Sequence, residues 1–188
     1  MRVIDGPNLV RAMLLAAAFL FSLTAQSQTL TVAGGETIRA NNSEHEAYRL
    51  EINFPWKPEL WKNDNWALSL NHALSVARFE DKNTVNAITW APNLILTRAR
   101  KSSVYPYLQF GFGVAYLSDD KFESKNPLYE GHKVSQMGSH GQFETSLALG
   151  LRKNAFGIRV KIYHYSNANL AKPNQGIDAA EFGISYSF

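Results

Sequence analysis

The chain has 188 residues, with 19 basic and 16 acidic residues, a formal net charge of +3 and no cysteine. The missing cysteines exclude a disulfide scaffold, thiol catalysis and thiolate metal sites. The charge balance is too mild to indicate binding to nucleic acid.

The first 27 residues have the layout of an export signal. Arg2 and Arg11 give a positively charged start, residues 13–21 form an unbroken apolar run, and residues 25–27 (Ala-Gln-Ser) offer small side chains at a cleavage site. The apolar run is too short to span a bilayer as a helix. We therefore expect a signal peptide over 1–27 and one domain over 28–188.

Apolar and polar residues then alternate with a period of two, which predicts strands. In the segment after residue 104, for example, Leu108, Phe110 and Phe112 alternate with Gln109 and Gly111. Two irregularities stand out: Pro92 predicts a bulge, and His72 interrupts an apolar face. The expected strands span residues 29–37, 45–56, 65–78, 84–98, 104–117, 140–152, 155–167 and 177–188.

Eight strands of this kind fit two architectures. A secreted, lipocalin-like barrel places its bulky apolar faces inside, around a ligand, whereas a membrane barrel turns them toward lipid and keeps a polar interior. Here the polar faces are rich in Gly, Ala and Ser, which suits a narrow interior, and the apolar faces carry Trp, Tyr or Phe near their ends. The pattern favours an all-β fold, an eight-stranded antiparallel up-and-down transmembrane β-barrel.

The lengths of the connections agree with a membrane barrel. Ser102 and Asn154 mark short turns at one end, while residues 118–139 and 168–176 are longer segments expected at the other end. With both termini in the periplasm, the longer segments lie at the cell surface. The connection expected around Pro55 to Asp64 is long for a periplasmic turn and counts against this picture.

The strand expected over 155–167 ends with two reactive side chains on its outer face. His164 and Ser166 continue the parity of Ile158 and Ile162, so both side chains project outward, two residues apart. This spacing lets an imidazole take a proton from a hydroxyl after modest adjustment. On the next strand, Asp178 has the outward parity and can orient the imidazole.

Polar residues near a barrel rim are ordinary, but three that converge on a lipid-directed face need partners there. Glu181 has the opposite parity and should point into the barrel. The other histidines, His45, His132 and His140, do not cluster in sequence and indicate no metal site.

The segment His164-Tyr-Ser-Asn-Ala, followed by Pro173-Asn-x-Gly-Ile and an acidic residue, resembles the C-terminal signature of the lipid A 3-O-deacylase family. The resemblance implies a serine esterase in which Ser166 is the nucleophile, His164 the general base and Asp178 the orienting acid. The family usually has Glu at the last of these positions. Asn167, Asn174 and the backbone amides near Ala168 and Asn169 resemble the region that would supply the oxyanion hole.

The resemblance further implies an enzyme of the bacterial outer membrane that removes the ester-linked 3-hydroxyacyl chain at position 3 of lipid A in lipopolysaccharide. It implies no cofactor and is compatible with a homodimer, although no residue pattern marks an interface. The alternative from another class is a non-enzymatic small barrel that serves in adhesion or envelope integrity.

Overall fold

The computed structural model describes residues 28–39, 45–100, 103–125 and 134–188. The export signal expected over 1–27 lies outside the described residues and stays a prediction, as does the loop residue His132. Among the described residues, no helix is long and apolar enough to cross a membrane.

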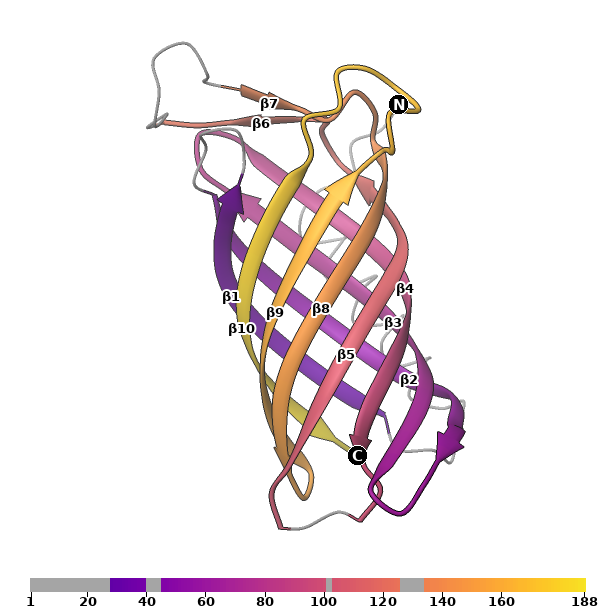
Figure 1. The fold of residues 1–188 in the computed structure, drawn as a ribbon. Helices are drawn as coiled ribbons and strands as arrows, with labels where there is room; N and C mark the ends of the chain where they lie inside the picture. Colours follow the sequence, from indigo (N-terminus) through magenta and orange to yellow (C-terminus); the bar gives the residue numbers. More distant parts are fainter. Residues whose placement is uncertain (1–27, 40–44, 101–102, 126–133) are drawn as a thin grey trace.

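Eight antiparallel strands close into a barrel, as the alternation predicted (Figure 1). Each barrel strand is hydrogen-bonded to the barrel strands that precede and follow it in the chain, and β1 pairs with β10 to close the barrel. Closure matters because it leaves no strand edge unpaired. The barrel strands are β1 (Thr29–Arg39), β2 (Glu46–Lys62), β3 (Trp66–Glu80), β4 (Thr84–Arg98), β5 (Tyr105–Leu117), β8 (Gly141–Lys153), β9 (Phe156–Ser166) and β10 (Ile177–Ser187).

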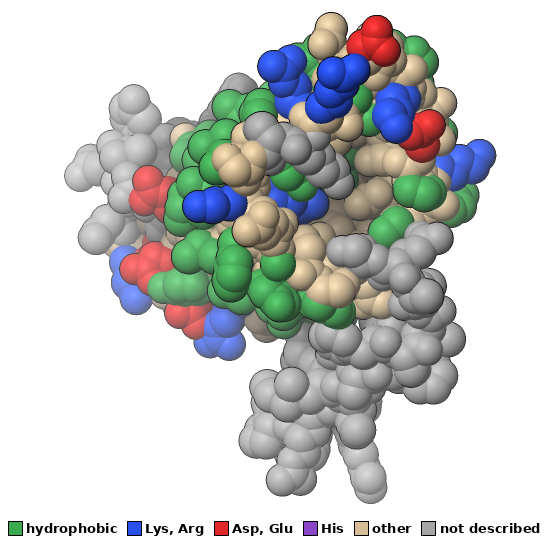
Figure 2. Space-filling model, turned by 90° about the horizontal axis from the view of Figure 1, so that it is seen from below, with side chains coloured by type: hydrophobic (Ala, Val, Ile, Leu, Met, Phe, Trp, Pro, Cys, Tyr) green, Lys and Arg blue, Asp and Glu red, His purple; other side chains and the backbone are tan. Residues whose placement is uncertain are grey.

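The bulky apolar faces point outward. Leu149 is 63% exposed and Val160 is 54% exposed, whereas Lys161, the neighbour of Val160 on β9, is only 2% exposed. The same alternation runs along β5, β8 and β10. Seen from the end at which the chain terminates, hydrophobic side chains gather on the flank of the molecule (Figure 2). This arrangement excludes a lipocalin-like barrel and is typical of a barrel whose solvent is lipid.

The lumen holds a network of buried ion pairs. Arg49 contacts Glu144 at 2.9 Å and Glu181 at 3.1 Å. Lys161 contacts Glu144 at 3.1 Å and Glu51 at 3.0 Å. Arg159 links Glu51 to Glu181. Three basic and three acidic side chains therefore neutralise one another inside the barrel, which is the condition for burying charge at all.

The two longest connections lie at the same end of the barrel, as expected. The turn end carries the connections 63–65, 99–104 and 154–155, and there Gln28 and Phe188 exchange backbone hydrogen bonds. The loop end carries the connections 118–140 and 167–176. The long connection expected around Pro55 to Asp64 is wrong: β2 continues to Lys62 with two register shifts, and the turn is short.

The bulge predicted at Pro92 is also wrong. Pro92 pairs with His72 on β3 in an unbroken register. His72 keeps the outward parity of its strand and lies between Trp56, at 4.3 Å between ring centroids, and Trp90, at 5.6 Å. Aromatic stacking across β2, β3 and β4 therefore accounts for a histidine on the apolar face.

One expected loop contains a small sheet of its own. Within residues 118–139, β6 (Lys121–Glu123) pairs with β7 (Val134–Gln136) in a hairpin that projects beyond the barrel (Figure 1). Phe122 of this hairpin is fully buried and packs edge-on against Phe79 of β3 and His45. These strands are too short for a period-of-two pattern to reveal.

The buried ion network predicts a large stability effect for Glu51→Gln. The substitution keeps the side-chain volume but leaves Arg159 and Lys161 with one positive charge in excess inside the lumen, so we expect a loss of about 3–5 kcal/mol in the free energy of unfolding. Urea unfolding of the protein in lipid vesicles, followed by tryptophan fluorescence, measures this loss. The matched control is Glu123→Gln, which removes a solvent-exposed pair with Lys82 and should leave the unfolding midpoint unchanged. Equal midpoints for Glu51→Gln and the native protein would contradict the account.

Candidate active site

His164 and Asp178 are hydrogen-bonded across two neighbouring strands. They occupy directly opposed positions on β9 and β10, and His164 Nδ1 lies 2.7 Å from Asp178 Oδ1. The side chains are 44% and 27% exposed, both on the outer face. Opposed residues bring their Cβ atoms to about 4.5–5.5 Å, so the short Asp side chain reaches the imidazole.

Ser166 is the last residue of β9 and shares the outer face with His164. Two residues along one strand are separated by about 7 Å, and no hydrogen bond joins the Ser166 hydroxyl to the His164 ring within the described residues. The structure therefore brings His164 and Asp178 together and leaves Ser166 on the same face beside them. Catalytic hydrogen bonds are often long in a free enzyme and tighten when substrate binds.

Gly176 lies directly against the His164 ring. It has a φ of +69°, and a Cβ atom at this position would lie 2.7 Å from His164 Cε1 and 3.4 Å from Nε2. A side chain there would displace the ring, so the position requires glycine both for its backbone conformation and for space.

A tight turn follows Ser166. Leu170 N donates to Asn167 O at 3.0 Å, and the two central residues, Ala168 and Asn169, have φ values of 52° and 62°. These features define a type I′ turn. A left-handed conformation costs a non-glycine residue about 1–2 kcal/mol, and strain of this kind clusters at functional sites.

Asn167 and Asn174 have different parts in this turn. The buried Asn167 amide donates through Nδ2 to Met137 O at 2.7 Å and to Ala171 O at 3.0 Å. Asn174 Oδ1 accepts from the Asn167 backbone N–H at 3.2 Å, and Asn174 Nδ2 has only a 3.4 Å contact with the Asn169 side chain. The geometry therefore favours Asn174 over Asn167 as a donor to a ligand, and makes Asn167 an anchor of the loop.

The segment after β7 supports the same loop. Gln175 N donates to Gln136 O at 3.1 Å. A Cβ atom on Gly138, which has a φ of +70°, would lie 2.3 Å from Pro173 O. The backbone near residue 138 thus packs directly against residues 171–173. Sequence reasoning missed this contact, because no local pattern links residues so far apart in the chain.

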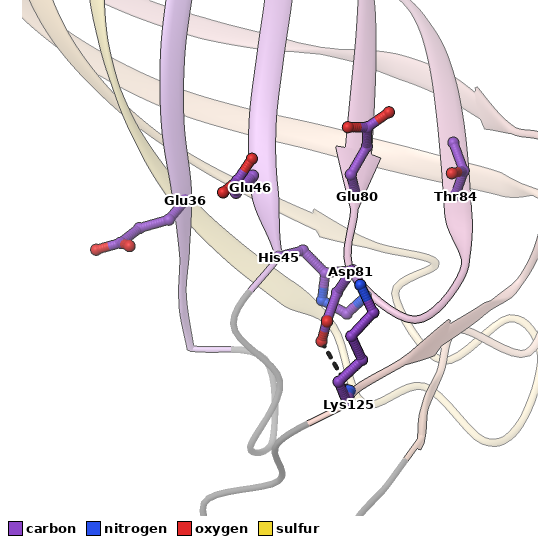
Figure 3. A pocket seen from close by; sticks show the side chains of 7 residues that line it. All are labelled: Glu36, His45, Glu46, Glu80, Asp81, Thr84 and Lys125. Carbon is purple, nitrogen blue, oxygen red and sulfur yellow. Dashed lines mark hydrogen bonds between the residues drawn. The ribbon is translucent and has the colours of Figure 1, made fainter.

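A separate pocket of about 440 Å³ lies at the loop end of β1–β4, and no residue of β9 or β10 lines it (Figure 3). Its lining includes the carboxylates of Glu36, Glu46, Glu80 and Asp81, and the Lys125 backbone N–H donates to Asp81 Oδ2 at 3.0 Å. Its acidic lining is unsuited to an acyl chain. In the described part of the chain, no group of three or more His, Asp or Glu side chains could hold a metal ion.

Comparisons with known proteins agree with the resemblance found in the sequence. Residues 46–187 match the family described as lipid A 3-O-deacylase (PagL). The chain is 26% identical over 172 residues to the lipid A deacylase PagL of Pseudomonas aeruginosa, covering 89% of this chain and 91% of that protein. It is also 26% identical over 173 residues to the lipid A deacylase PagL of Bordetella bronchiseptica, covering 88% of each.

Two solved structures share the fold. The crystal structure of the outer membrane enzyme PagL aligns with a TM-score of 0.70 at 23% identity, covering 84% of this chain and 98% of that one. Neisserial surface protein A aligns with a TM-score of 0.51 at 10% identity, covering 86% of this chain and 96% of that one. At these identities the likeness concerns the barrel alone.

Proposed function

The chain belongs to the lipid A 3-O-deacylase family, and we propose that Ser166, His164 and Asp178 form its catalytic triad on the lipid-facing side of the barrel. The protein is an ester hydrolase of the bacterial outer membrane that acts on lipid A. Family membership argues against the alternative of a non-enzymatic barrel. The observation that carries the triad proposal is the His164–Asp178 hydrogen bond on the outer face.

The hydrogen bond assigns the protons. A carboxylate only accepts, so Asp178 stabilises the imidazole tautomer in which Nδ1 carries the hydrogen and Nε2 is free to accept one. Ser166 attacks the ester carbonyl while His164 Nε2 takes the hydroxyl proton, and His164 then returns the proton to the leaving sugar oxygen. Water opens the acyl-enzyme with the same base. No cofactor is needed for this scheme.

The turn after Ser166 supplies candidate donors for the oxyanion. Ala168 N–H and Asn169 N–H donate no hydrogen bond to any residue that the structure describes. Asn174 Oδ1 accepts a hydrogen bond from Asn167 N–H, which orients the amide group. Asn174 Nδ2 makes only the 3.4 Å contact with Asn169 Oδ1, so it can donate to a ligand. Donors fixed before reaction stabilise the developing negative charge without having to reorganise. We assign this role to Asn174 and one of the two backbone amides.

The position of the triad suits the substrate. The loop end lies at the cell surface in this proposal, so Ser166 lies near the upper edge of the lipid-facing belt. Lipopolysaccharide in the outer leaflet carries its ester carbonyls just below the headgroups. The substrate then reaches the triad by lateral diffusion in the leaflet, with its 3-O-linked 3-hydroxyacyl chain in the membrane. The possible homodimer stays a prediction.

Replacing the nucleophile tests the proposal directly. Native protein refolded in detergent should release 3-hydroxy fatty acid from lipopolysaccharide, and Ser166→Ala should lower the rate at least about 1000-fold because no acyl-enzyme forms. Mass spectrometry of lipid A measures the loss of the acyl chain. Unchanged lipid A after incubation with folded native protein, or an active Ser166→Ala variant, would refute the assignment.

The identity of the acid is tested by comparing two neighbouring carboxylates. Asp178→Asn should lower kcat about 100- to 10,000-fold, since an amide no longer selects the productive imidazole tautomer. Glu181 faces the lumen and contacts Arg49 and Arg159, so Glu181→Gln should reduce stability but leave the kcat of the folded protein within a few fold. The opposite ranking of the two kcat values would exclude Asp178 as the third member.

A further inference from the structure

Thr145 is a polar residue on an otherwise apolar outer face. It is exposed on β8, and the other residues of the same parity between Phe143 and Leu151 are apolar. The sequence pattern alone concealed it, because Thr145 occupies a position of the apolar parity. These apolar neighbours are Phe143, Leu147, Leu149 and Leu151.

The register places Thr145 in the same row as the proposed triad. Thr145 opposes His164 across β8 and β9, and His164 opposes Asp178 across β9 and β10. Thr145 and Asp178 therefore flank the imidazole from opposite sides. Phe143 opposes Ser166, so Thr145 is also the diagonal neighbour of Ser166, at about 7–8 Å.

The Thr145 hydroxyl has no hydrogen-bond partner among the described residues, whereas the imidazole beside it is held on one side. His164 Nδ1 is held by Asp178, but Thr145 makes no side-chain hydrogen bond to any described residue. A hydroxyl that faces lipid without a partner is unfavourable. Substrate lying over the row would supply that partner.

We propose that Thr145 recognises the 3-hydroxyl group of the acyl chain that is cleaved. This inference rests on the proposed function. When the ester carbonyl lies at Ser166 with its oxygen toward the turn at 168–169, the acyl chain runs away from the loop end over the outer face of β8 and β9. The 3-hydroxyl is on the second carbon beyond the carbonyl, beside the row of Thr145 and His164. A threonine hydroxyl both donates and accepts, so it pairs with an alcohol.

The recognition gives the enzyme a basis for choosing among esters. A site that hydrogen-bonds a substrate hydroxyl discriminates against the analogue that lacks it. Leu147, the next outward residue on β8, has an apolar side chain. The rest of the acyl chain therefore makes apolar contacts, and only its hydroxyl binds Thr145. Thr145 is thus a specificity residue for the proposed reaction.

The test compares two glucosamine 3-O-esters of equal chain length, one with a 3-hydroxyacyl chain and one with an unsubstituted chain. Native protein should prefer the hydroxylated ester. Thr145→Val, which keeps the shape, should lower kcat/KM for that ester about tenfold and leave kcat/KM for the unsubstituted ester unchanged. Thr145→Ser should restore the preference. The heat-dependent mobility shift of the refolded variants on gels verifies that each barrel is folded.

The outcomes separate this inference from the proposed function. Equal losses on both esters, no loss on either, or a native enzyme without preference would overturn the role of Thr145 while Ser166-dependent hydrolysis remained. A native protein that hydrolyses neither ester, or hydrolysis that survives Ser166→Ala, would overturn the proposed function itself.

Discussion

The structure depends on the mutual neutralisation of charge inside the barrel. Arg49, Arg159 and Lys161 meet three carboxylates in the lumen, each within hydrogen-bond reach of a basic partner. This network fills the interior with charges that are already paired with opposite charges. The inner carboxylate Glu181 is part of it, whereas Asp178, three residues earlier on the same strand, faces outward. The parity of β10 therefore separates a carboxylate that supports the fold from one that is available for chemistry.

Strand register explains how the short side chain of Asp178 reaches His164, as the proposed triad requires. Asp178 and His164 are directly opposed rather than diagonal, so the shorter side chain still closes to 2.7 Å. The same register brings Thr145 to the other side of the imidazole. One row across three strands thus holds the proposed orienting carboxylate, the proposed base and the hydroxyl that we assign to substrate recognition, and all three residues belong to strands rather than loops.

Much of this could be predicted from sequence because the period of a strand is two. The eight barrel strands, the outward direction of His164 and the inward direction of Glu181 all follow from parity, and all are confirmed. Parity cannot predict contacts between segments that are far apart in the sequence. Gly138 lies against residues 171–173, and Met137 O accepts from Asn167, yet neither relation leaves a local pattern. The stacking of His72 between two tryptophans was missed for the same reason.

The proposed site must open to lipid at the rim of the barrel, because its substrate lies in the membrane. The chain has no cysteine, so a single nitroxide label at Ser166→Cys reports its surroundings in bilayers without background. We predict collision with oxygen comparable to that of a label at Ile162→Cys, and less collision with a water-soluble nickel chelate than a label at Lys172→Cys shows. A label at 166 that is inaccessible to oxygen, as in the packed lumen, or as open to the chelate as the label at 172, would contradict the account.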